Sequence, residues 1–238
     1  MSPDFSIRAS TPELMDTEPC GFEAFRDCLV DLAAVNRLTL AHVPTMAFLQ
    51  RLLREGRIGR QAPLRVLDVG AGYGDLVRKI DRWAGRRGLA VELTGVDLNP
   101  WSTRAAQEAT APGRPIRWLA SNVFDYQGRA DVIVSSLFAH HLDDAALVRF
   151  LAWMEARAGV AWFVNDLHRR AFPYYGFALL SRLMRWHRFV RHDGPVSISR
   201  AFRPEDWRRL IEQAGLPPGE VEIARRFPWR LCVARVRR

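Results

Sequence analysis

Hydrophobic residues recur along this chain at two different spacings. From Gly21 to about Gly56 they return at every third or fourth position, which predicts two helices. After residue 60, short apolar runs rich in β-branched residues alternate with longer stretches of helical spacing. This alternation predicts an α/β fold, with a parallel sheet covered by helices on both faces. The predicted strands span residues 64–69, 91–96, 116–119, 132–135, 160–165, 221–224 and 229–236.

Local signals at the ends of these segments support the same fold. Asn99, which Pro100 follows, and Asp143 are each suited to begin a helix between two strands. The last two predicted strands are joined by a tight connection around Pro228, which predicts an antiparallel pair. We therefore expect a mostly parallel sheet of seven strands with an antiparallel last strand.

The same pattern divides the chain into three parts. Residues 1–19 are polar and contain proline, and we expect them to be poorly ordered. Residues 20–60 form a helical cap outside the main sheet, and residues 61–238 form the main domain. Within this domain, residues 168–199 interrupt the alternation as an apolar and aromatic insert. Because the insert follows the fifth strand, we expect a helical lid over the carboxyl ends of the strands. A helix packed on the core is the alternative.

The most informative motif is a glycine turn after the first predicted strand, with the sequence V-L-D-V-G-A-G-Y-G-D-L from Val66 to Leu76. Its glycines allow a tight turn and leave room for a ligand to lie against the backbone. The dinucleotide-binding fingerprint needs G-x-G-x-x-G, but the third position here is Asp75. The spacing therefore argues against a dinucleotide site.

The glycine turn, together with Asp68 two residues before Gly70, resembles the first motif of the class I S-adenosylmethionine-dependent methyltransferases. Further motifs follow in the order that this family shows, so the resemblance covers about residues 60–236. It implies a Rossmann-like sheet, S-adenosylmethionine as the cofactor and methyl transfer as the reaction. We therefore expect an enzyme whose main domain binds S-adenosylmethionine.

Ligands in such sheets lie at the carboxyl ends of the strands, and the candidate cofactor residues fall there. Asp97 ends the second strand and can accept from both ribose hydroxyls, and Leu98 beside it can pack on the adenine. At Asn122 the family often has an acid that accepts from the adenine amine, and the amide oxygen can still accept. A helix cap or turn is the alternative role for each of these polar residues. The expected cofactor-binding residues are Asp68, Gly70, Ala71, Gly72, Asp97, Leu98, Asn122, Val123 and Ser135.

Later motifs narrow the resemblance. The segment S-L-F-A-H-H-L-D at residues 136–143 resembles small-molecule methyltransferases of the ubiquinone-biosynthesis type, and it lacks the prolines typical of base-amino methylases. Residues 164–169, 174–176 and 200–202, with the Asn36-Arg37 region, resemble bacterial methyltransferases of type III polyketide, phenolic-lipid and pigment pathways. This resemblance implies an aromatic, phenolic or quinol-like acceptor with an apolar tail, methylated on oxygen or carbon.

Three histidines, His140, His141 and His168, lie near predicted strand ends and are candidates for the catalytic base. A phenol must lose a proton, and histidine ionises near neutral pH. We prefer His140 toward the substrate, and Asp166 could orient His168 as an acid–histidine pair. A structural hydrogen bond is the alternative role for each histidine. The expected substrate-binding residues are Phe138, Asp166, Tyr174 and Tyr175.

Charge and cysteines limit the choice of partners. The net charge of +9 is typical of nucleic-acid binders, but Lys79 is the only lysine and the arginines are scattered, so we expect no nucleic-acid partner. Arginines in the insert permit at most peripheral membrane contact. The three cysteines have neither disulfide nor metal-ligand spacing, so we expect no metal. The insert arginines are Arg182, Arg185, Arg188 and Arg191.

The absence of a leader and of a long apolar stretch predicts a cytoplasmic protein. We expect a monomer or a homodimer. Two other functions stay open at this point. An RNA or protein methyltransferase would use the arginine-rich surface, and a non-catalytic partner subunit would keep the fold and only bind the cofactor.

Overall fold

The computed structural model describes residues 3–237 of the chain. Within them, seven strands form one sheet in the order β3-β2-β1-β4-β5-β7-β6. Strand β7 runs antiparallel to both of its neighbours, and the other pairs are parallel. The predicted Rossmann-like α/β architecture is therefore confirmed. The strands are β1 (Leu64–Val69), β2 (Val91–Asp97), β3 (Ile116–Ala120), β4 (Ala130–Ser136), β5 (Ala158–Leu167), β6 (Val221–Arg226) and β7 (Arg230–Val236).

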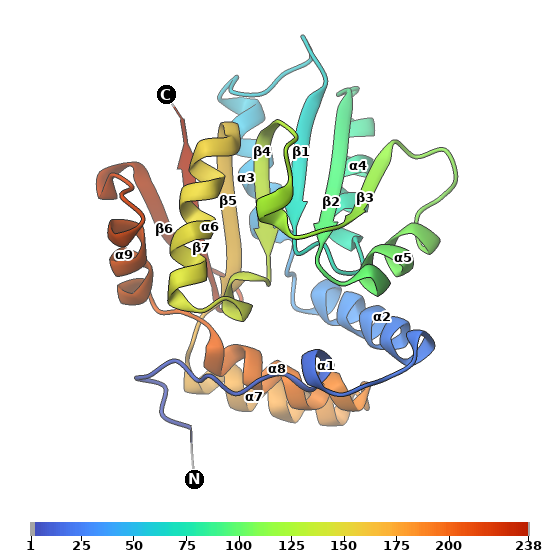
Figure 1. Ribbon diagram of the computed structural model, residues 1–238, viewed down its shortest axis with the longest axis vertical. Coiled ribbons are helices and arrows are strands. Elements are labelled where there is room, and N and C mark those ends of the chain that lie inside the picture. The colour runs from blue at the N-terminus through green and yellow to red at the C-terminus, as the bar shows by residue number, and fades with distance from the viewer. Residues whose placement is uncertain (1–2, 238) are drawn as a thin grey trace.

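Helices cover both faces of this sheet (Figure 1). On one face, α3 (Val43–Arg54) and α4 (Asp75–Gly85) form a hydrophobic core with the strands. On the other face, α6 (Asp144–Arg157) and α9 (Pro204–Gln213) form a second core. Helix α5 (Pro100–Glu108) packs against β2 and β3. The central strands are thus buried on both sides, which explains why they read as nearly continuous apolar runs.

Two of the predicted helix starts are confirmed by their hydrogen bonds. The side-chain oxygen of Asn99 accepts from the backbone N–H of Trp101 at 2.9 Å, and the Asp143 carboxylate accepts from that of Ala146 at 2.7 Å. Each bond satisfies a donor that the first helical turn leaves free, which is worth about 1 kcal/mol. These caps start α5 after β2 and α6 after β4.

A separate layer of helices lies across the carboxyl ends of the strands (Figure 1). It contains α1 (Leu14–Thr17), α2 (Phe22–Leu38), α7 (Ala171–Leu183) and α8 (Arg188–Arg200). The insert after β5 forms α7 and α8, which pack against each other. Helix α2 joins this layer, whereas α3 packs on the sheet itself. None of the helices within residues 3–237 has the length and apolar character needed to cross a membrane.

The N-terminal segment, residues 3–19, lies along this layer, although the sequence predicts poor order there. The buried guanidinium of Arg169 donates to the backbone oxygens of Phe5 and Ser6 at 3.0 and 3.2 Å. The Asp193 carboxylate accepts from two backbone N–H groups at the start of α1, at 2.8 and 3.0 Å. Both anchoring side chains come from the insert, so no local pattern in residues 1–19 predicts these contacts.

Candidate active site

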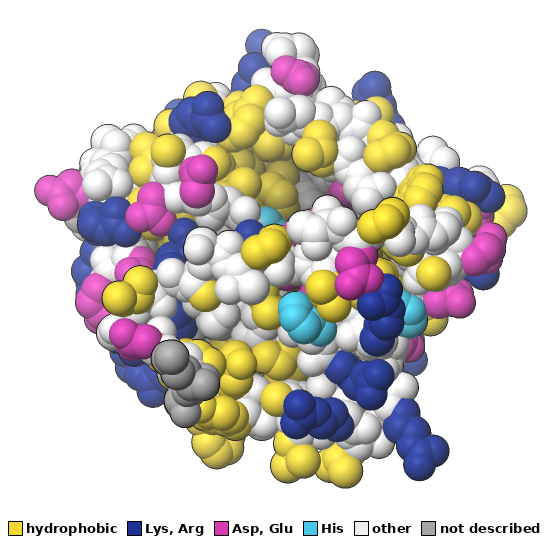
Figure 2. All heavy atoms as spheres, turned by 60° about the horizontal axis from the view of Figure 1, so that its bottom comes forward, with side chains coloured by type: hydrophobic (Ala, Val, Ile, Leu, Met, Phe, Trp, Pro, Cys, Tyr) yellow, Lys and Arg dark blue, Asp and Glu magenta, His cyan; other side chains and the backbone are white. Residues whose placement is uncertain are grey.

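A cavity of about 450 Å³ lies between the carboxyl ends of the strands and the helical layer, within the size range of small-molecule sites. Its walls come from α2, the glycine turn after β1, the segment after β4, the end of β5, α7 and the start of β7. Figure 2 brings this side of the molecule forward and shows a hollow with hydrophobic side chains inside it. A mainly apolar ligand therefore suits this cavity.

The glycine turn has the conformation and the open space that a bound ligand requires. Gly70 has a φ of 71°, and a Cβ added there would lie 2.5 Å from the ring of Phe138. Gly72 has a φ of 51°, and a Cβ added there would meet no atom within 4 Å. The ring of Phe138 thus fills the space beside Gly70, while the space beside Gly72 stays free for a ligand.

Two carboxylates stand beside this turn. Asp68 is fully buried, and its Oδ1 has no hydrogen-bond partner among the described residues. Burial, with the nearby charges of Asp75 and Asp97, raises the pKa of Asp68 well above its usual value. Asp97 accepts from the N–H groups of Gly72 and Asn99 at 2.8 and 2.9 Å, and burial raises its pKa. S-adenosylmethionine carries a sulfonium and an ammonium group, so these acids and the open turn fit its charge.

A further acidic group at this turn was not predicted from the sequence. Asp75, at the start of α4, lies 2.7 Å from Nε2 of His42 and accepts from the Asn36 amide at 3.3 Å. Burial alone would raise the pKa of Asp75, but these two partners hold it below its usual value. Asp75 directly follows the glycine turn, which is the one signal that could have revealed it. His42 lies between two helices and has no such signal.

Asp166 pairs with His140 and not with His168, which corrects the predicted pair. Its two oxygens lie 2.7 Å from Nδ1 of His140 and 2.9 Å from the backbone N of the same residue. Because β4 and β5 are adjacent and parallel, the short helix after β4 lies beside the end of β5. His168 instead continues the antiparallel pairing, with its N–H donating to the Trp229 oxygen at 3.1 Å.

The Asp166–His140 pair is almost completely buried, with 0% and 3% of the two residues exposed. Burial alone would raise the pKa of Asp166, but His140 and two backbone N–H groups hold it below its usual value. With Nδ1 bonded to a carboxylate, the proton of neutral His140 is held on that side. Nε2 is then the atom free to accept a proton.

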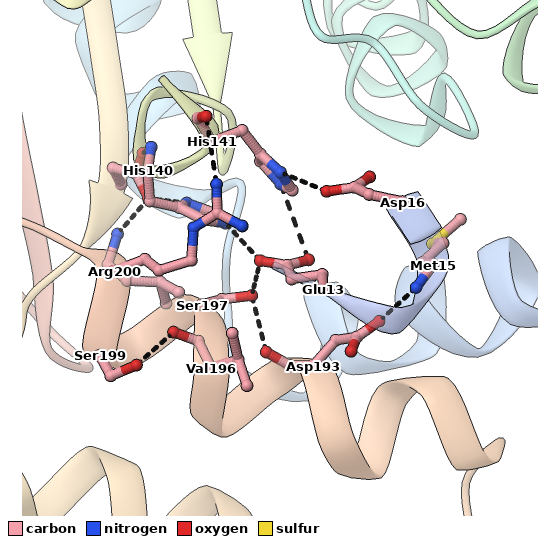
Figure 3. A network of polar contacts seen from close by, with 12 residues as sticks. Glu13, Met15, Asp16, His140, His141, Asp193, Val196, Ser197, Ser199 and Arg200 are labelled. Carbon is pink, nitrogen blue, oxygen red and sulfur yellow. Dashed lines mark hydrogen bonds and ion pairs between the residues drawn. The ribbon is translucent and has the colours of Figure 1, made fainter. Parts of the chain in front are cut away.

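Two acids from the N-terminal segment reach the same histidines (Figure 3). Glu13 lies 3.7 Å from Nε2 of His140 and 3.9 Å from Nε2 of His141, and it accepts from the Ser197 hydroxyl at 2.7 Å. Asp16 lies 3.4 Å from Nδ1 of His141. Burial alone would lower the pKa of His141, but the charges of Asp16 and Glu13 outweigh it and raise the pKa. Neither acid was predicted from the sequence, because both lie in a segment with no periodic pattern.

The cluster also has the composition of a metal site. Ligand atoms of Glu13, His140 and His141 all lie within 4.8 Å of one another. Asp166 stands behind His140 as carboxylates do behind metal-bound histidines. These three side chains could therefore hold a metal ion, although the sequence predicts none.

The backbone between β4 and this cluster is strained. Leu137 has a φ of 58°, in the left-handed region that a branched side chain rarely adopts. Its N–H donates to the Asn165 oxygen at 2.9 Å, and Leu137 also lines the cavity. Strain of this kind costs about 1–3 kcal/mol and gathers at functional sites.

Several of the predicted cofactor residues make structural contacts instead of lining the cavity. The Asn122 oxygen accepts from the N–H of Phe124 at 3.1 Å, and the Ser135 hydroxyl donates to the Val69 oxygen at 3.1 Å. Val123 packs in the core, and Leu98 is 74% exposed. Among the predicted cofactor residues, those that line the cavity are Asp68, Gly70, Ala71 and Gly72.

The predicted substrate residues Phe138, Asp166, Tyr174 and Tyr175 do not line the cavity. Phe138 packs against Gly70 and Phe150 outside the cavity, and the rings of Tyr174 and Tyr175 contact Phe5. A different face of α7 from the one that carries Tyr174 and Tyr175 lines the cavity. His168 lines the cavity beside it. Burial and nearby arginines lower the pKa of His168 to about 4, so it is neutral. The α7 residues in the wall are Phe172, Pro173, Gly176, Phe177 and Leu180.

Known proteins place this site in context. The family described as "Methyltransferase domain" matches residues 40–218, well over half of the chain. No match was found among curated protein sequences. One similar solved structure is the magnesium protoporphyrin IX methyltransferase from Synechocystis PCC 6803 with bound SAM. It is 14% identical, with a TM-score of 0.58 over 97% of this chain and 100% of that chain.

Two further solved structures are similar. The putative O-methyltransferase from Nostoc punctiforme PCC 73102 is 17% identical, with a TM-score of 0.57 over 88% of this chain and 60% of that chain. The plantazolicin methyltransferase BpumL in complex with SAH is 12% identical, with a TM-score of 0.57 over 94% of this chain and 88% of that chain. At such identities these neighbours show the fold alone. The family match goes further: this chain belongs to the methyltransferase domain family and is an enzyme that uses S-adenosylmethionine.

Proposed function

We propose that this enzyme methylates a small, lipophilic aromatic acceptor, such as a phenol or quinol of polyketide origin. The observation that carries the proposal is the buried Asp166–His140 pair at the wall of a mainly apolar cavity. The pair can accept a proton, and the cavity suits an aromatic ring. The neighbouring methyltransferases for magnesium protoporphyrin IX and plantazolicin add support for a small-molecule or peptide acceptor.

The cofactor would occupy the glycine-turn side of the cavity. Asp97 would accept from the ribose hydroxyls, and the open space beside Gly72 would take the methionine part. The unpartnered oxygen of Asp68 would face the ammonium group. When bound, S-adenosylmethionine supplies an electrophilic methyl group on sulfur.

His140 would then act as the general base for O-methylation. As the phenol oxygen bonds to the methyl carbon, Nε2 of His140 takes the phenol proton, and Asp166 stabilises the resulting imidazolium. The cofactor would supply the methyl group and keep the electron pair on its sulfur, so that the protein's own residues would handle only the proton. The protonated His140 afterwards returns its proton to water. Carbon methylation of an activated ring would use the same base to remove the ring proton.

The layer of α1, α2, α7 and α8 would keep water out of this reaction. Apolar groups on α2 and α7 form much of the cavity wall. In a dry site the charge of Asp166 acts more strongly on His140 than it would in water. The layer would thus select an apolar acceptor and strengthen the base together. The cytoplasmic location of the enzyme and its monomeric or homodimeric state stay predictions.

Calorimetric titration with S-adenosylhomocysteine tests the cofactor half of the proposal. We expect micromolar or tighter binding, and folded protein that binds none would contradict it. Transfer of labelled methyl from S-adenosylmethionine to a panel of alkylphenols, alkylresorcinols and quinols tests the acceptor half. Methylation of RNA or protein in place of every phenol would overturn the proposed acceptor class.

A further inference from the structure

Arg230 is a buried cation in the cavity wall that the proposed reaction does not use. It begins β7, is only 3% exposed and lines the cavity. Its Nη2 donates to the Thr39 hydroxyl at 3.0 Å. Its Nε and Nη1 are also buried, and neither has a hydrogen-bond partner within residues 3–237.

Such an arrangement is unfavourable unless a ligand completes it. A buried guanidinium loses its hydration, and each unsatisfied donor adds a further cost. Burial lowers the pKa of Arg230 to about 10, although the charge of Asp166 opposes this shift. The Asp166 carboxylate itself is already hydrogen-bonded to His140 and to the N–H of Leu167. The described residues therefore offer no acceptor for these two nitrogens, and a molecule that fills the cavity can supply one.

We propose that Arg230 binds a carboxylate of the methyl acceptor, so that the substrate is an aromatic acid and not a neutral phenol. The planar, fixed donors of a guanidinium match the geometry of a carboxylate. The Thr39 hydroxyl holds one nitrogen in place and leaves two to donate. This inference rests on the proposed function for the identity of the acceptor.

The position of Arg230 favours the acceptor over the cofactor as the source of this carboxylate. In the sheet, β7 is three strands from β1, which carries the glycine turn. At about 4.8 Å between neighbouring strands, the two strand ends lie roughly 14 Å apart. Arg230 instead starts the strand that pairs with the end of β5, and the charges of Asp166 and Arg230 act on each other. A carboxylate on Arg230 would therefore place the ring of the acceptor on the His140 side of the cavity.

A matched pair of probes tests this assignment by calorimetry in the presence of S-adenosylhomocysteine. The probes are 2-hydroxy-6-pentylbenzoate and 3-pentylphenol, which differ only by the carboxylate. We expect Arg230→Met to weaken binding of the benzoate on the order of tenfold to a hundredfold and to leave binding of the phenol within about twofold. Arg230→Lys keeps the charge and should lose less. Arg225→Met removes an exposed arginine near the same strand connection and is the matched control.

Thermal unfolding without ligand adds a readout that a purely structural role would not produce. Replacing an unpaired buried charge by an apolar side chain of similar length often stabilises a protein, so we expect Arg230→Met to raise Tm. A large fall in Tm would instead show that Arg230 also stabilises the fold, and the probe comparison would then decide the proposal. If the variant fails to fold, Arg230→Lys and the wild-type preference between the two probes still decide the question.

Cofactor titrations separate the remaining outcomes. If Arg230→Met weakens binding of S-adenosylhomocysteine but not of methylthioadenosine, which lacks the amino-acid part, Arg230 binds the cofactor carboxylate and the assignment is wrong. Equal affinity of the wild type for both probes would also overturn it. Failure of the wild type to bind S-adenosylhomocysteine would contradict the proposed function itself, while the probe comparison without the nucleoside would still test Arg230.

Discussion

The two sides of the cavity are built in different ways. The glycine-turn side comes from β1, the turn that follows it and the start of α4, all within a short stretch of sequence. The acceptor side combines the N-terminal segment, α2, α7 and the start of β7 with the short helix after β4. The first side is a local motif, whereas the second exists only when distant segments meet. A local site should tolerate damage to the helical layer, and an assembled site should not.

The largest expected effect tests the local side. Asp97→Ala removes the carboxylate that would accept two ribose hydroxyls, and hydrogen bonds to a charged group are worth about 1.5–3 kcal/mol each. We expect the Kd for S-adenosylhomocysteine to rise on the order of a thousandfold in calorimetric titration. Asp125→Ala, an exposed acid after β3, is the control. An Asp97→Ala protein that binds as tightly as wild type would place the cofactor elsewhere.

The next effect separates the two sides. His140→Ala should lower kcat on the order of a hundredfold, because the phenol loses its base, while affinity for S-adenosylhomocysteine stays within about twofold. The deficit should shrink as the pH approaches about 10, where a phenol ionises without help. A pH–rate profile from labelled methyl transfer measures this. A constant deficit at all pH values would show that His140 positions the acceptor and does not take its proton.

A smaller effect concerns the anchoring of the N-terminal segment. Asp193→Ala frees the two N–H groups at the start of α1, which should cost about 2 kcal/mol of docking. Trypsin should then cleave after Arg8 roughly thirtyfold faster, while affinity for S-adenosylhomocysteine is unchanged. Asp27→Ala, on the exposed side of α2, is the matched control. Loss of cofactor affinity in Asp193→Ala would remove the distinction between the two sides.

The smallest effect is a pH dependence of stability. The pKa of folded His141 is raised above its usual value, in part by Asp16, so this contact stabilises the fold below the unfolded pKa. The stabilisation is lost as pH rises through the folded pKa. We expect the difference in free energy of unfolding between wild type and Asp16→Asn to be larger at about pH 6 than at about pH 8.5. Urea titrations at both values measure it, and an equal difference would argue that the contact is absent in solution.

The sequence predicts the fold and the glycine turn well, because both depend on short-range patterns. The segment Val66 to Leu76 predicts a strand, a turn and a helix in that order, and β1 has the predicted bounds. The positions of Tyr174 and Tyr175 in the sequence do not predict which face of α7 lines the cavity, because that face depends on how α7 packs on α8. The partner of Asp166 depends on which strands are neighbours, so the pairing with His168 was wrong.

Residues of the acceptor side were missed for the same reason. Glu13 is one polar residue among many in the N-terminal segment, and only its contact with Ser197 and two histidines distinguishes it. Arg230 looks in the sequence like one more arginine in an arginine-rich chain. Only its burial and its unpartnered nitrogens single it out.

The two ends of the described chain differ in how well each suits the attachment of a purification tag. The N-terminal segment runs along the helical layer, whereas the described chain ends after β7 at the opposite end of the strands (Figure 1). A purification tag fused to the N-terminus would therefore begin beside the segment that carries Glu13 and Asp16 to the histidines. A tag fused to the C-terminus would project away from the cavity. Preparations that differ only in the end carrying the tag should bind the cofactor alike and differ in turnover.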